Sequence, residues 1–400
     1  MIKLGEIFCG PGGFAEGAKK AKGFKHVWAN DIDPDACKTF QKHHPDCEVV
    51  QGDVYEDFIK DRMKKLKKID GLIFGFPCND FSMAGKKQSL KGKYGPLYKA
   101  ACEVLNYFKP TFFVAENVSA IMSPLVFDPK KSTNGKYHRI KAENSEKYLN
   151  FKKIITDLAS CSPYGYKVYA DKFKFEEYGV PQTRHRQILV GYRGDYELKN
   201  NVQYETPKKS EKKISSKEAL EIGVPDTIQN SKSLEKAKNQ ELTKHSSDVL
   251  KRLMNTKEGQ NVWQLDDEFG LPNVKSARMS NIYKKLESNK PSYTVTGSGG
   301  GGTHVYHYKE NRALTNRERA RLQTFDDKYD FLGNKEAVRK QIGMAVPVLA
   351  AKKIMIQVKK SLKPKSVKRN IHHDIMVEPK GKELNITIKE KSNNQYEFDY

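Results

Sequence analysis

The sequence has few cysteines, few acidic residues for its length and no long apolar run. Its six cysteines, at positions 9, 37, 47, 78, 102 and 161, show neither metal-ligand spacing nor the density of a disulfide framework. No apolar stretch approaches the ~20 residues of a membrane-spanning helix. A predicted strand begins too early for a signal peptide to precede it. We therefore expect a cytoplasmic protein with reduced thiols, no metal and no membrane segment.

Basic residues strongly outnumber acidic residues. Lysine and arginine number 72 against 49 aspartate and glutamate residues, a formal net charge of +23 over 400 residues. Such an excess favours a polyanionic partner, and nucleic acid suits it better than a membrane surface. The length is typical of one large domain with a smaller second domain.

Short apolar runs alternate with helical patterns in the first half of the chain, which predicts an α/β fold with a doubly wound, mostly parallel sheet. Strands are expected at residues 5–8, 27–30, 48–51, 69–74, 111–115, 166–170 and 187–192. Helices are expected at residues 15–22, from Pro34 onward, and at 96–108 and 151–160. Residues 128–150 are polar and rich in lysine, and indicate an insertion.

Glycine or aspartate follows each of the first three predicted strands. The first runs into residues 9–14 (Cys-Gly-Pro-Gly-Gly-Phe), the second ends at Asp31 and the third at Asp53. A glycine turn before a helix lets backbone amides approach a ligand, and an acidic residue after the second strand suits ribose hydroxyls. The spacing is not Gly-x-Gly-x-x-Gly, so the pattern predicts a nucleoside site of another kind. A purely structural turn is the alternative.

Two reactive side chains follow later strands. Cys78 lies in Gly-Phe-Pro-Cys after the fourth strand, and Glu116 follows the fifth in Glu-Asn-Val. Ligands bind at the carboxyl ends of such strands, which makes both candidates for chemistry, although a lone cysteine is more often a small buried hydrophobe. Farther on, strand alternation aims Arg184 and Arg186 the same way.

Together these motifs resemble the cytosine-5 DNA methyltransferases of bacterial restriction-modification systems. The matching segments follow the family's order at residues 8–13, 77–78, 116–118, 182–186, 312–325 and 343–347. Asn79 stands where many members have glutamine, and Met344 and Ala345 stand where many have asparagine and a small polar residue. The resemblance implies a fold typical of S-adenosylmethionine-dependent methyltransferases, with a catalytic domain at 1–194 and 311–358, a target-recognition domain at 195–310 and a basic extension at 359–400.

The resemblance also implies the reaction: methyl transfer from S-adenosylmethionine to C5 of a cytosine flipped out of duplex DNA. The Cys78 thiolate would attack C6, Glu116 would contact N3 and the exocyclic amine, Arg186 would hold O2 and Arg184 would support the site. The implied cofactor-binding residues are Phe8, Cys9, Gly10, Gly12, Gly13, Asp31, Ile32, Asp53, Val54, Pro77, Leu97 and Ala345.

DNA contacts are expected from two stretches. The basic loop after Cys78 contributes Ser82, Lys86, Lys87, Lys91 and Lys93, with solvated surface as the alternative. In the recognition domain, Arg278 would read guanine and Asn281 adenine, while Lys284 and Lys285 would contact phosphates; a surface salt bridge is the alternative for Arg278. The family also implies a monomer, nucleoid association through DNA and a cognate endonuclease acting on the same site.

Two other functions are compatible with the motifs: a tRNA cytosine-5 methyltransferase and a non-catalytic DNA-binding relative. The long interval before residue 311 favours DNA, and the intact catalytic residues favour an enzyme. Residues 297–302 fit Gly-x-Gly-x-x-Gly, but no helix follows, so we predict a hairpin joining 293–296 to 304–308. For the tail after residue 359 the composition favours disorder. The alternative is one strand at residues 383–390, where polar and apolar side chains alternate.

Overall fold

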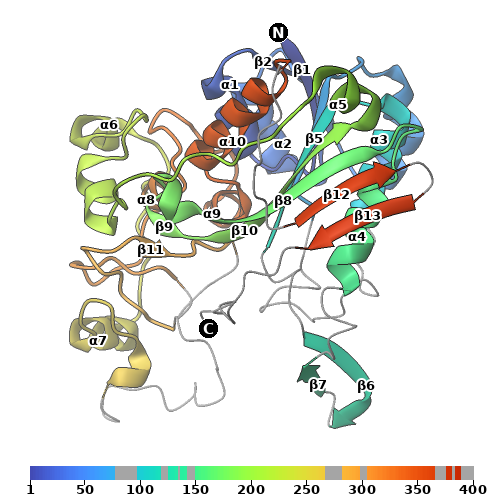
Figure 1. The fold of residues 1–400 in the computed structure, drawn as a ribbon. Helices are drawn as coiled ribbons and strands as arrows, with labels where there is room; N and C mark the ends of the chain where they lie inside the picture. The colour runs from blue at the N-terminus through green and yellow to red at the C-terminus, as the bar shows by residue number, and fades with distance from the viewer. Residues whose placement is uncertain are drawn as a thin grey trace.

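The computed structural model describes residues 1–76, 97–118, 125–133, 136–141, 149–265, 282–297, 304–364, 375–380 and 383–388. A nine-stranded sheet forms the centre of this described part, in the order β13-β12-β8-β10-β5-β4-β1-β2-β3 (Figure 1). The strands are β1 Ile2–Ile7, β2 Phe24–Asp31, β3 Glu48–Gln51, β4 Gly71–Phe74, β5 Phe112–Val118, β8 Tyr166–Lys174, β10 His185–Arg193, β12 Ile375–Lys380 and β13 Glu383–Ile388.

The predicted α/β class is confirmed. Strands β3, β2, β1, β4 and β5 pair in parallel, and β10 joins β5 and β8 in antiparallel register. Parallel strands covered on both faces are apolar throughout, and all four residues of β4 are buried. Close packing of β1 on β2 requires Gly5, since a Cβ there would lie 2.1 Å from the Trp28 ring.

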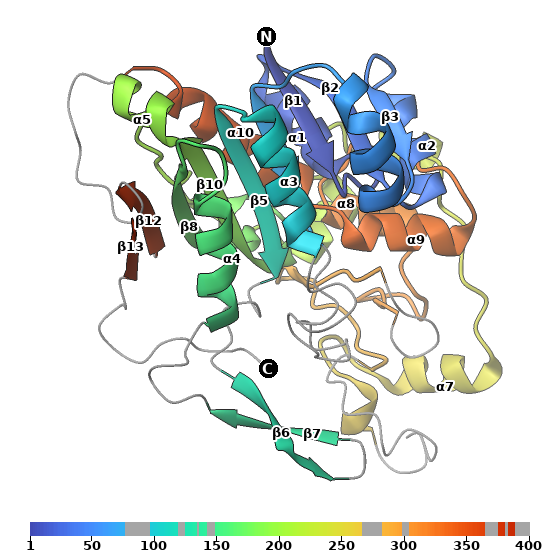
Figure 2. The ribbon, with the colours of Figure 1, turned by 90° about the vertical axis from the view of Figure 1, so that its right-hand side faces the viewer.

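Helices cover both faces of the sheet (Figure 2). One face carries α1 (Gly13–Ala21) and α10 (Val348–Ser361). The other carries η1 (Val54–Arg62), α3 (Tyr98–Phe108) and α4 (Leu149–Ala159). The remaining helices of the main body are α2 Pro34–His43, η6 Phe175–Tyr178, α5 Gly194–Asn200, α8 Asn316–Leu322 and α9 Lys335–Met344. The amino-terminal and carboxyl-terminal parts of the chain therefore build one core.

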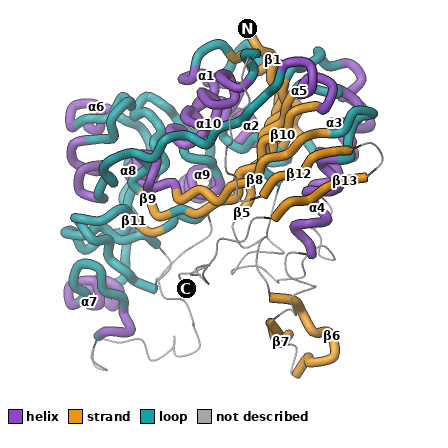
Figure 3. The backbone as a smooth tube through the Cα atoms, viewed as in Figure 1, coloured by secondary structure: helices purple, strands orange, loops and turns teal. Residues whose placement is uncertain are grey.

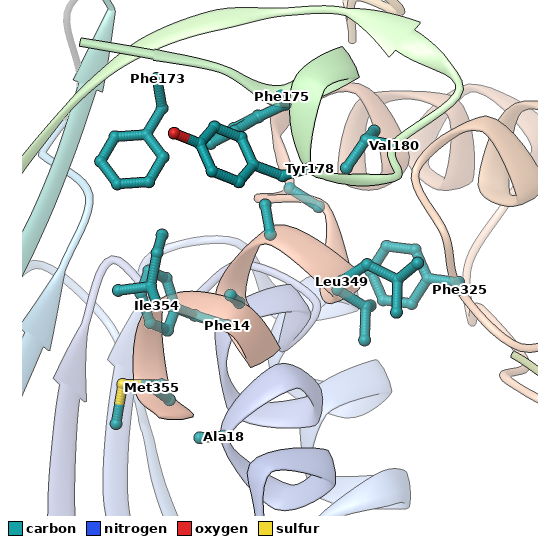
Figure 4. Close-up of a cluster of buried hydrophobic side chains, with 14 of the residues drawn as sticks. Phe14, Ala18, Phe173, Phe175, Tyr178, Val180, Phe325, Leu349, Ile354 and Met355 are labelled. Carbon is teal, nitrogen blue, oxygen red and sulfur yellow. The ribbon is translucent and has the colours of Figure 1, made fainter. Parts of the chain in front are cut away.

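The contact between α1 and α10 shows how closely those two parts pack. Phe14 and Ala18 of α1 face Leu349, Ile354 and Met355 of α10 in a buried cluster that the aromatic side chains of η6 extend (Figure 4). Gly17 permits the approach, because a Cβ there would lie 2.4 Å from the Ala351 side chain. Helix α10 is thus part of the same core as α1.

This packing also explains one apolar segment. Residues Lys335–Ser361, which comprise α9 and α10, are by length and composition able to cross a membrane, since they contain an 18-residue window with a mean hydropathy of 1.2, although the sequence is expected to contain no such stretch. In the structure 67% of that apolar window is buried. Its hydropathy therefore reflects the side chains that α10 packs against α1 and the sheet.

The described residues between β10 and α8 form mostly loops and short helices (Figure 3). Their first part, including Val202, Tyr204 and Leu220, packs into the main core. A separate small core contains Leu253, Val262, Ile282, Tyr283, Tyr306 and Ala313. This part holds η7 Glu218–Ile222, α6 Ser231–Lys236, α7 Ser247–Asn255, η8 Val262–Gln264 and β11 Ser292–Tyr293, which pairs with β9 Gln182–Thr183.

Two local predictions differ from the structure, and the predicted insertion contains strands that were not predicted. The insertion contains a hairpin of β6 (Leu125–Thr133) and β7 (Lys136–Lys141). The hairpin expected between residues 293–296 and 304–308 is wrong, since Tyr306 bridges Lys285 and Ala313 instead. In the tail, the strand at 383–390 is confirmed at 383–388, but the preference for disorder is wrong there, because β12 and β13 extend the central sheet at β8.

Candidate active site

The loop after β1 has the backbone geometry of a close-approach site. Phe8, Gly10 and Gly12 have positive φ angles of 58°, 53° and 93°, and α1 begins at the next residue, Gly13. A bulky residue such as Phe8 rarely adopts this conformation, so its position is imposed by the surrounding structure. A Cβ at Gly13 would lie 2.3 Å from the Val346 carbonyl oxygen, so the first and last sequence motifs are in direct contact.

Asp31, at the end of β2, is anchored to this loop. Its Oδ2 accepts a hydrogen bond from the Gly10 amide at 2.7 Å, and its Oδ1 accepts from the Asp33 amide at 2.9 Å. Burial raises the pKa of the carboxyl group, while these two backbone hydrogen bonds lower it. A carboxylate oxygen can accept more than one hydrogen bond, so Asp31 keeps acceptor sites for the hydroxyls of a ribose.

The neighbouring residues divide into those that can touch a ligand and those that shape the backbone. Ile32 is 66% exposed beside Asp31, as expected for a side chain that packs on adenine. Asp53 caps η1, its Oδ1 accepting from the Tyr55 and Glu56 amides. Cys9 and Val54 are buried at 5% and 3% exposure, so only their backbone can reach a cofactor.

Two further predicted cofactor residues lie at the edge of this site. Leu97 is partly buried against the core beneath α3, immediately before that helix. Ala345 is 4% exposed and lies next to Gly13, and its carbonyl accepts from the Gln323 side chain at 3.2 Å. Backbone contact is therefore the form in which Ala345 can serve a ligand.

Glu116 and Arg186 form the charged pair of the site. They lie on adjacent antiparallel strands, β5 and β10, two register positions apart on one face. Oε1 of Glu116 lies 2.8 Å from Nε of Arg186, and each side chain is 13% exposed. The N–H is not aligned for a hydrogen bond, and Glu116 Oε1 has no hydrogen-bond partner. The pair is thus held by charge, with its acceptor capacity available to a ligand.

Asn117 fastens the end of β4 to the end of β5. It is 1% exposed, its Nδ2 donates to the Phe76 carbonyl at 3.3 Å and its Oδ1 accepts from the Val118 amide at 2.8 Å. Gly75 faces Glu116, with 3.6 Å between Glu116 Oε2 and the position of a Cβ on Gly75. Phe76 is the last described residue before Pro77 and Cys78, so β4 leaves the sheet beside Glu116.

Arg184 has a different environment from Arg186, although alternation predicted a common direction. Its guanidinium is buried and donates to the carbonyls of Val295 at 3.3 Å and Gly343 at 3.2 Å. Residue 184 lies between β9 and β10, where the strand pattern is interrupted. Arg184 therefore joins the catalytic domain to the segment before residue 297, a supporting position.

Several predicted residues cannot be placed. Those outside the described residues are Pro77, Cys78, Ser82, Lys86, Lys87, Lys91, Lys93, Arg278 and Asn281. The structure describes two lysines that were predicted to contact phosphates, Lys284 and Lys285. Lys284 is partly exposed, and its ammonium lies 5.9 Å from the Tyr293 ring centre. Lys285 is 5% exposed and donates to Asn311 at 2.7 Å, so the structure does not present it to a phosphate.

Sequence reasoning missed two contacts around the site. Lys340 donates to Asp33 at 2.7 Å, which joins α9 to the turn that carries Asp31 and Ile32. Asn117 was noted only as part of a motif, and its role in joining two strands depends on an atom of Phe76, 41 residues away. No local signal could reveal either contact. Among the described residues, no cluster of three or more histidine, cysteine, aspartate or glutamate side chains could hold a metal ion.

Known proteins resemble this chain over most of its length. The profile of the C-5 cytosine-specific DNA methylase family matches residues 2–360. The Type II methyltransferase M.BbvI of Brevibacillus brevis is 47% identical over 376 residues, covering 90% of this chain and 91% of that protein. M.NgoFVII of Neisseria gonorrhoeae is 35% identical over 349 residues, covering 86% and 83%.

Solved structures show the same fold. A DNA modification methyltransferase encoded within an Escherichia coli prophage superposes with a TM-score of 0.64 at 23% identity, covering 90% of this chain and 99% of that chain. The Entamoeba histolytica methyltransferase EhMeth superposes with a TM-score of 0.53 at 15% identity, covering 90% and 98%. The family match over nearly the whole described core decides the assignment: the chain belongs to the C-5 cytosine-specific DNA methylases.

Proposed function

We propose that this DNA cytosine-5 methyltransferase is the modification enzyme of a Type II restriction-modification system, with Cys78 as its nucleophile and S-adenosylmethionine as its methyl donor. The observation that supports the catalytic assignment best is the Glu116–Arg186 pair at the point where β4 leaves the sheet. Covalent geometry keeps the Cα of Cys78 within about 7 Å of the Cα of Phe76, which Asn117 holds to β5.

The residue types suit the reaction. Addition of the Cys78 thiolate to C6 of cytosine opens the C5–C6 double bond and makes C5 nucleophilic. Glu116 contacts N3 and the exocyclic amine, and Arg186 holds O2, so that charge developing on the ring meets fixed partners. After C5 has gained the methyl group, its proton passes to a base, the double bond re-forms and the bond from sulfur to C6 breaks.

The cofactor site is proposed on the first three strands. S-adenosylmethionine supplies an electrophilic methyl group on its sulfonium. Asp31 binds the ribose hydroxyls, Phe8 and Ile32 pack on the adenine, and Asp53 accepts from the adenine amine. The backbone of residues 9–13, in which Gly10 and Gly12 have positive φ angles, would hold the amino-acid part of the cofactor.

Sequence recognition is proposed for residues 195–310, and the separate core of residues 253–313 supports a distinct unit there. Arg278 and Asn281 remain the proposed base-reading residues, and the basic residues 86–93 the proposed contacts that close over the flipped cytosine. A monomer that acts in the cytoplasm beside a cognate endonuclease completes the proposal. A tRNA substrate is disfavoured because the curated relatives are Type II methyltransferases.

The test is covalent trapping on a duplex that contains 5-fluorocytosine. Fluorine at C5 replaces the proton that must leave, so the bond from sulfur to C6 persists after methyl transfer and the complex resists denaturation. We expect the wild-type enzyme to be trapped on its duplex and not on tRNA. Cys78→Ser, whose hydroxyl is far less acidic than a thiol, should bind the duplex without trapping. Trapping of the serine variant, or methylation of tRNA alone, would contradict the proposal.

A further inference from the structure

Helix α8 carries three buried arginines at alternate positions, and only two of them are satisfied. Arg317 donates to the carbonyls of Lys238, Asp326 and Tyr329 at 2.9–3.0 Å. Arg321 forms a bidentate pair with Asp327 at 3.0 and 2.6 Å. These two guanidiniums show what a buried arginine needs in this protein: several carbonyls or a carboxylate.

Arg319, between them, lacks such partners. It is 2% exposed, and its one hydrogen-bonding contact is from Nη2 to Nδ1 of His304 at 3.4 Å. No carboxylate among the described residues pairs with it. Burial is the main reason why the pKa of Arg319 falls to about 10; Arg339 contributes to the fall, while Tyr293, Tyr306 and Glu318 act in the opposite direction. An unpaired cation in this position is costly unless an anion joins it.

Arg339, from α9, faces the same place with the same deficit. Its Nε is buried without a hydrogen-bond partner. Its ion pair is a 3.8 Å contact to Glu336, a side chain that is itself 83% exposed. Helices α8 and α9 lie side by side (Figure 1), and the charge of Arg339 acts on both Arg319 and His304.

His304 reports the same excess of positive charge. Its pKa is lowered to about 4. Burial is the main cause, and Arg319, Arg339, His245 and Lys335 each contribute. The groups that face it are therefore cationic or neutral, including the His245 ring at 6.4 Å and the Tyr306 ring at 6.2 Å between centroids. One bound anion would balance the excess positive charge of the cluster formed by Arg319, Arg339 and His304.

The cluster lies where the glycine-rich segment begins and ends. His304 follows that segment, and Gly297 precedes it. Gly297 packs directly on α9, since a Cβ at Gly343 would lie 1.9 Å from the Gly297 amide nitrogen. A ligand bound to the arginines would thus contact the junction of the recognition region and the catalytic core.

We propose that Arg319, Arg339 and His304 form a binding site for a backbone phosphate of the duplex DNA substrate. The proposal rests on duplex DNA being the substrate. It gives a role to residues to which the six motifs assign none. A guanidinium matches a phosphate in a bidentate geometry, and a second guanidinium with a protonated imidazole would complete the contact. Phosphate binding would supply the anion that Arg319 lacks.

The first experiment measures DNA affinity against salt concentration for the wild-type enzyme and Arg339→Gln. Each lost phosphate contact makes the slope of log affinity against log salt shallower by about 0.9. The matched control is Arg62→Gln, whose side chain pairs with Glu48 at the amino end of β3, whereas the proposed cofactor site lies at the carboxyl ends of the strands. We expect a shallower slope for Arg339→Gln and an unchanged slope for Arg62→Gln.

The second experiment needs no variant and so does not depend on one folding. The His304 imidazole is titrated by NMR with isotope-labelled histidine, first in the free enzyme, then with duplex, then with inorganic phosphate at the same phosphate concentration. We expect the duplex alone to raise the pKa of His304. A rise with inorganic phosphate together with an unchanged salt slope for Arg339→Gln would assign the site to a free anion and overturn the proposal, as would no rise in either case. Failure of the wild-type enzyme to methylate duplex DNA would instead count against the proposed function.

Discussion

The Asn117 side chain holds the Phe76 carbonyl, with 3.3 Å between Nδ2 and oxygen, and so joins the end of β4 to the end of β5. Pro77 and Cys78 follow Phe76 directly, and Glu116 directly precedes Asn117. The spacing between the proposed nucleophile and the proposed ring-binding carboxylate is therefore set through one buried amide. Asn117 touches neither reacting atom, which makes it a positioning residue.

Asn117→Ala should lower kcat by at least about tenfold while leaving the KM for DNA nearly unchanged. Loss of both hydrogen bonds in a buried place should also cost about 1–3 kcal/mol of unfolding free energy. Single-turnover methylation and urea unfolding measure the two effects. Asn316→Ala is the control, because Asn316 is 3% exposed and donates to the Lys335 carbonyl at 2.9 Å outside the catalytic site. Equal loss of kcat in both variants would show that only stability matters.

Glu116→Gln should abolish most of the activity and leave DNA binding intact. The substitution keeps the shape of the side chain but removes the charge that faces Arg186 and the cytosine ring, a change typically worth about 10²–10⁴-fold in rate. Methyl transfer under saturating duplex, together with a direct binding assay, separates the two properties.

The control for Glu116 is Glu176, a buried carboxylate that pairs with the residue next to Arg186. Glu176 lies 3.0 Å from the His185 ring nitrogen, one residue before Arg186, and is 4% exposed. Glu176→Gln should retain a rate within about threefold of the wild-type enzyme, since its partner takes no part in catalysis. A Glu176 variant as slow as the Glu116 variant would refute the assignment of Glu116.

Stability should fall in mild acid, in part through His44. Burial, together with smaller contributions from His26, Lys19 and His43, lowers the pKa of His44 to about 3 in the folded protein. An unfolded histidine has a pKa of about 6.5, so below that pH the unfolded chain takes up a proton that the folded chain refuses. This contribution to stability is complete above about pH 6.5 and is lost as the pH falls toward 3, by up to about 1.4 kcal/mol per pH unit.

His44→Gln should therefore flatten the dependence of unfolding free energy on pH between 6.5 and 4. Its lost contact with the Phe40 ring affects all pH values alike, which is why the slope and not the absolute stability is compared. Urea unfolding at several pH values gives the slope. Burial also lowers the pKa of His26 to about 3. His26 should therefore maintain part of the pH dependence of the unfolding free energy in the His44 variant. A slope identical to that of the wild-type protein would contradict the prediction.

The site residues that the sequence predicts correctly are those that directly follow a recognisable strand pattern in the chain. A short apolar run followed by aspartate or glycine places Asp31 and Asp53 at the ends of β2 and β3, as the structure has them. Glu116 lies in the last part of β5 for the same reason. In each case the element and the residue that ends it are neighbours in the chain.

Contacts between distant segments escaped prediction. Arg184 and Arg186 are two residues apart, yet one donates to Val295 and Gly343 and the other pairs with Glu116. Helix α8 has an arginine-rich sequence that suits an exposed surface, but partners from residues 219–239 and 326–329 bury it. Periodicity carries no information about such partners.

The tail gives the last prediction. Val377 of β12 is fully buried against the core that includes α4, and β12 pairs with β8 over Ile375–Val377. Val377→Asp would place a charge in an apolar site, so it should lower the unfolding free energy by several kcal/mol and the Tm by several degrees. Leu198→Asp, on α5 at 82% exposure, is the control and should leave the Tm within about a degree. The specific rate of the folded fraction should be unchanged in both variants, because the hairpin lies at the sheet edge farthest from β1 and β2. An unaltered Tm for Val377→Asp would show that the tail does not pack on the sheet, and the composition-based expectation of disorder would then hold.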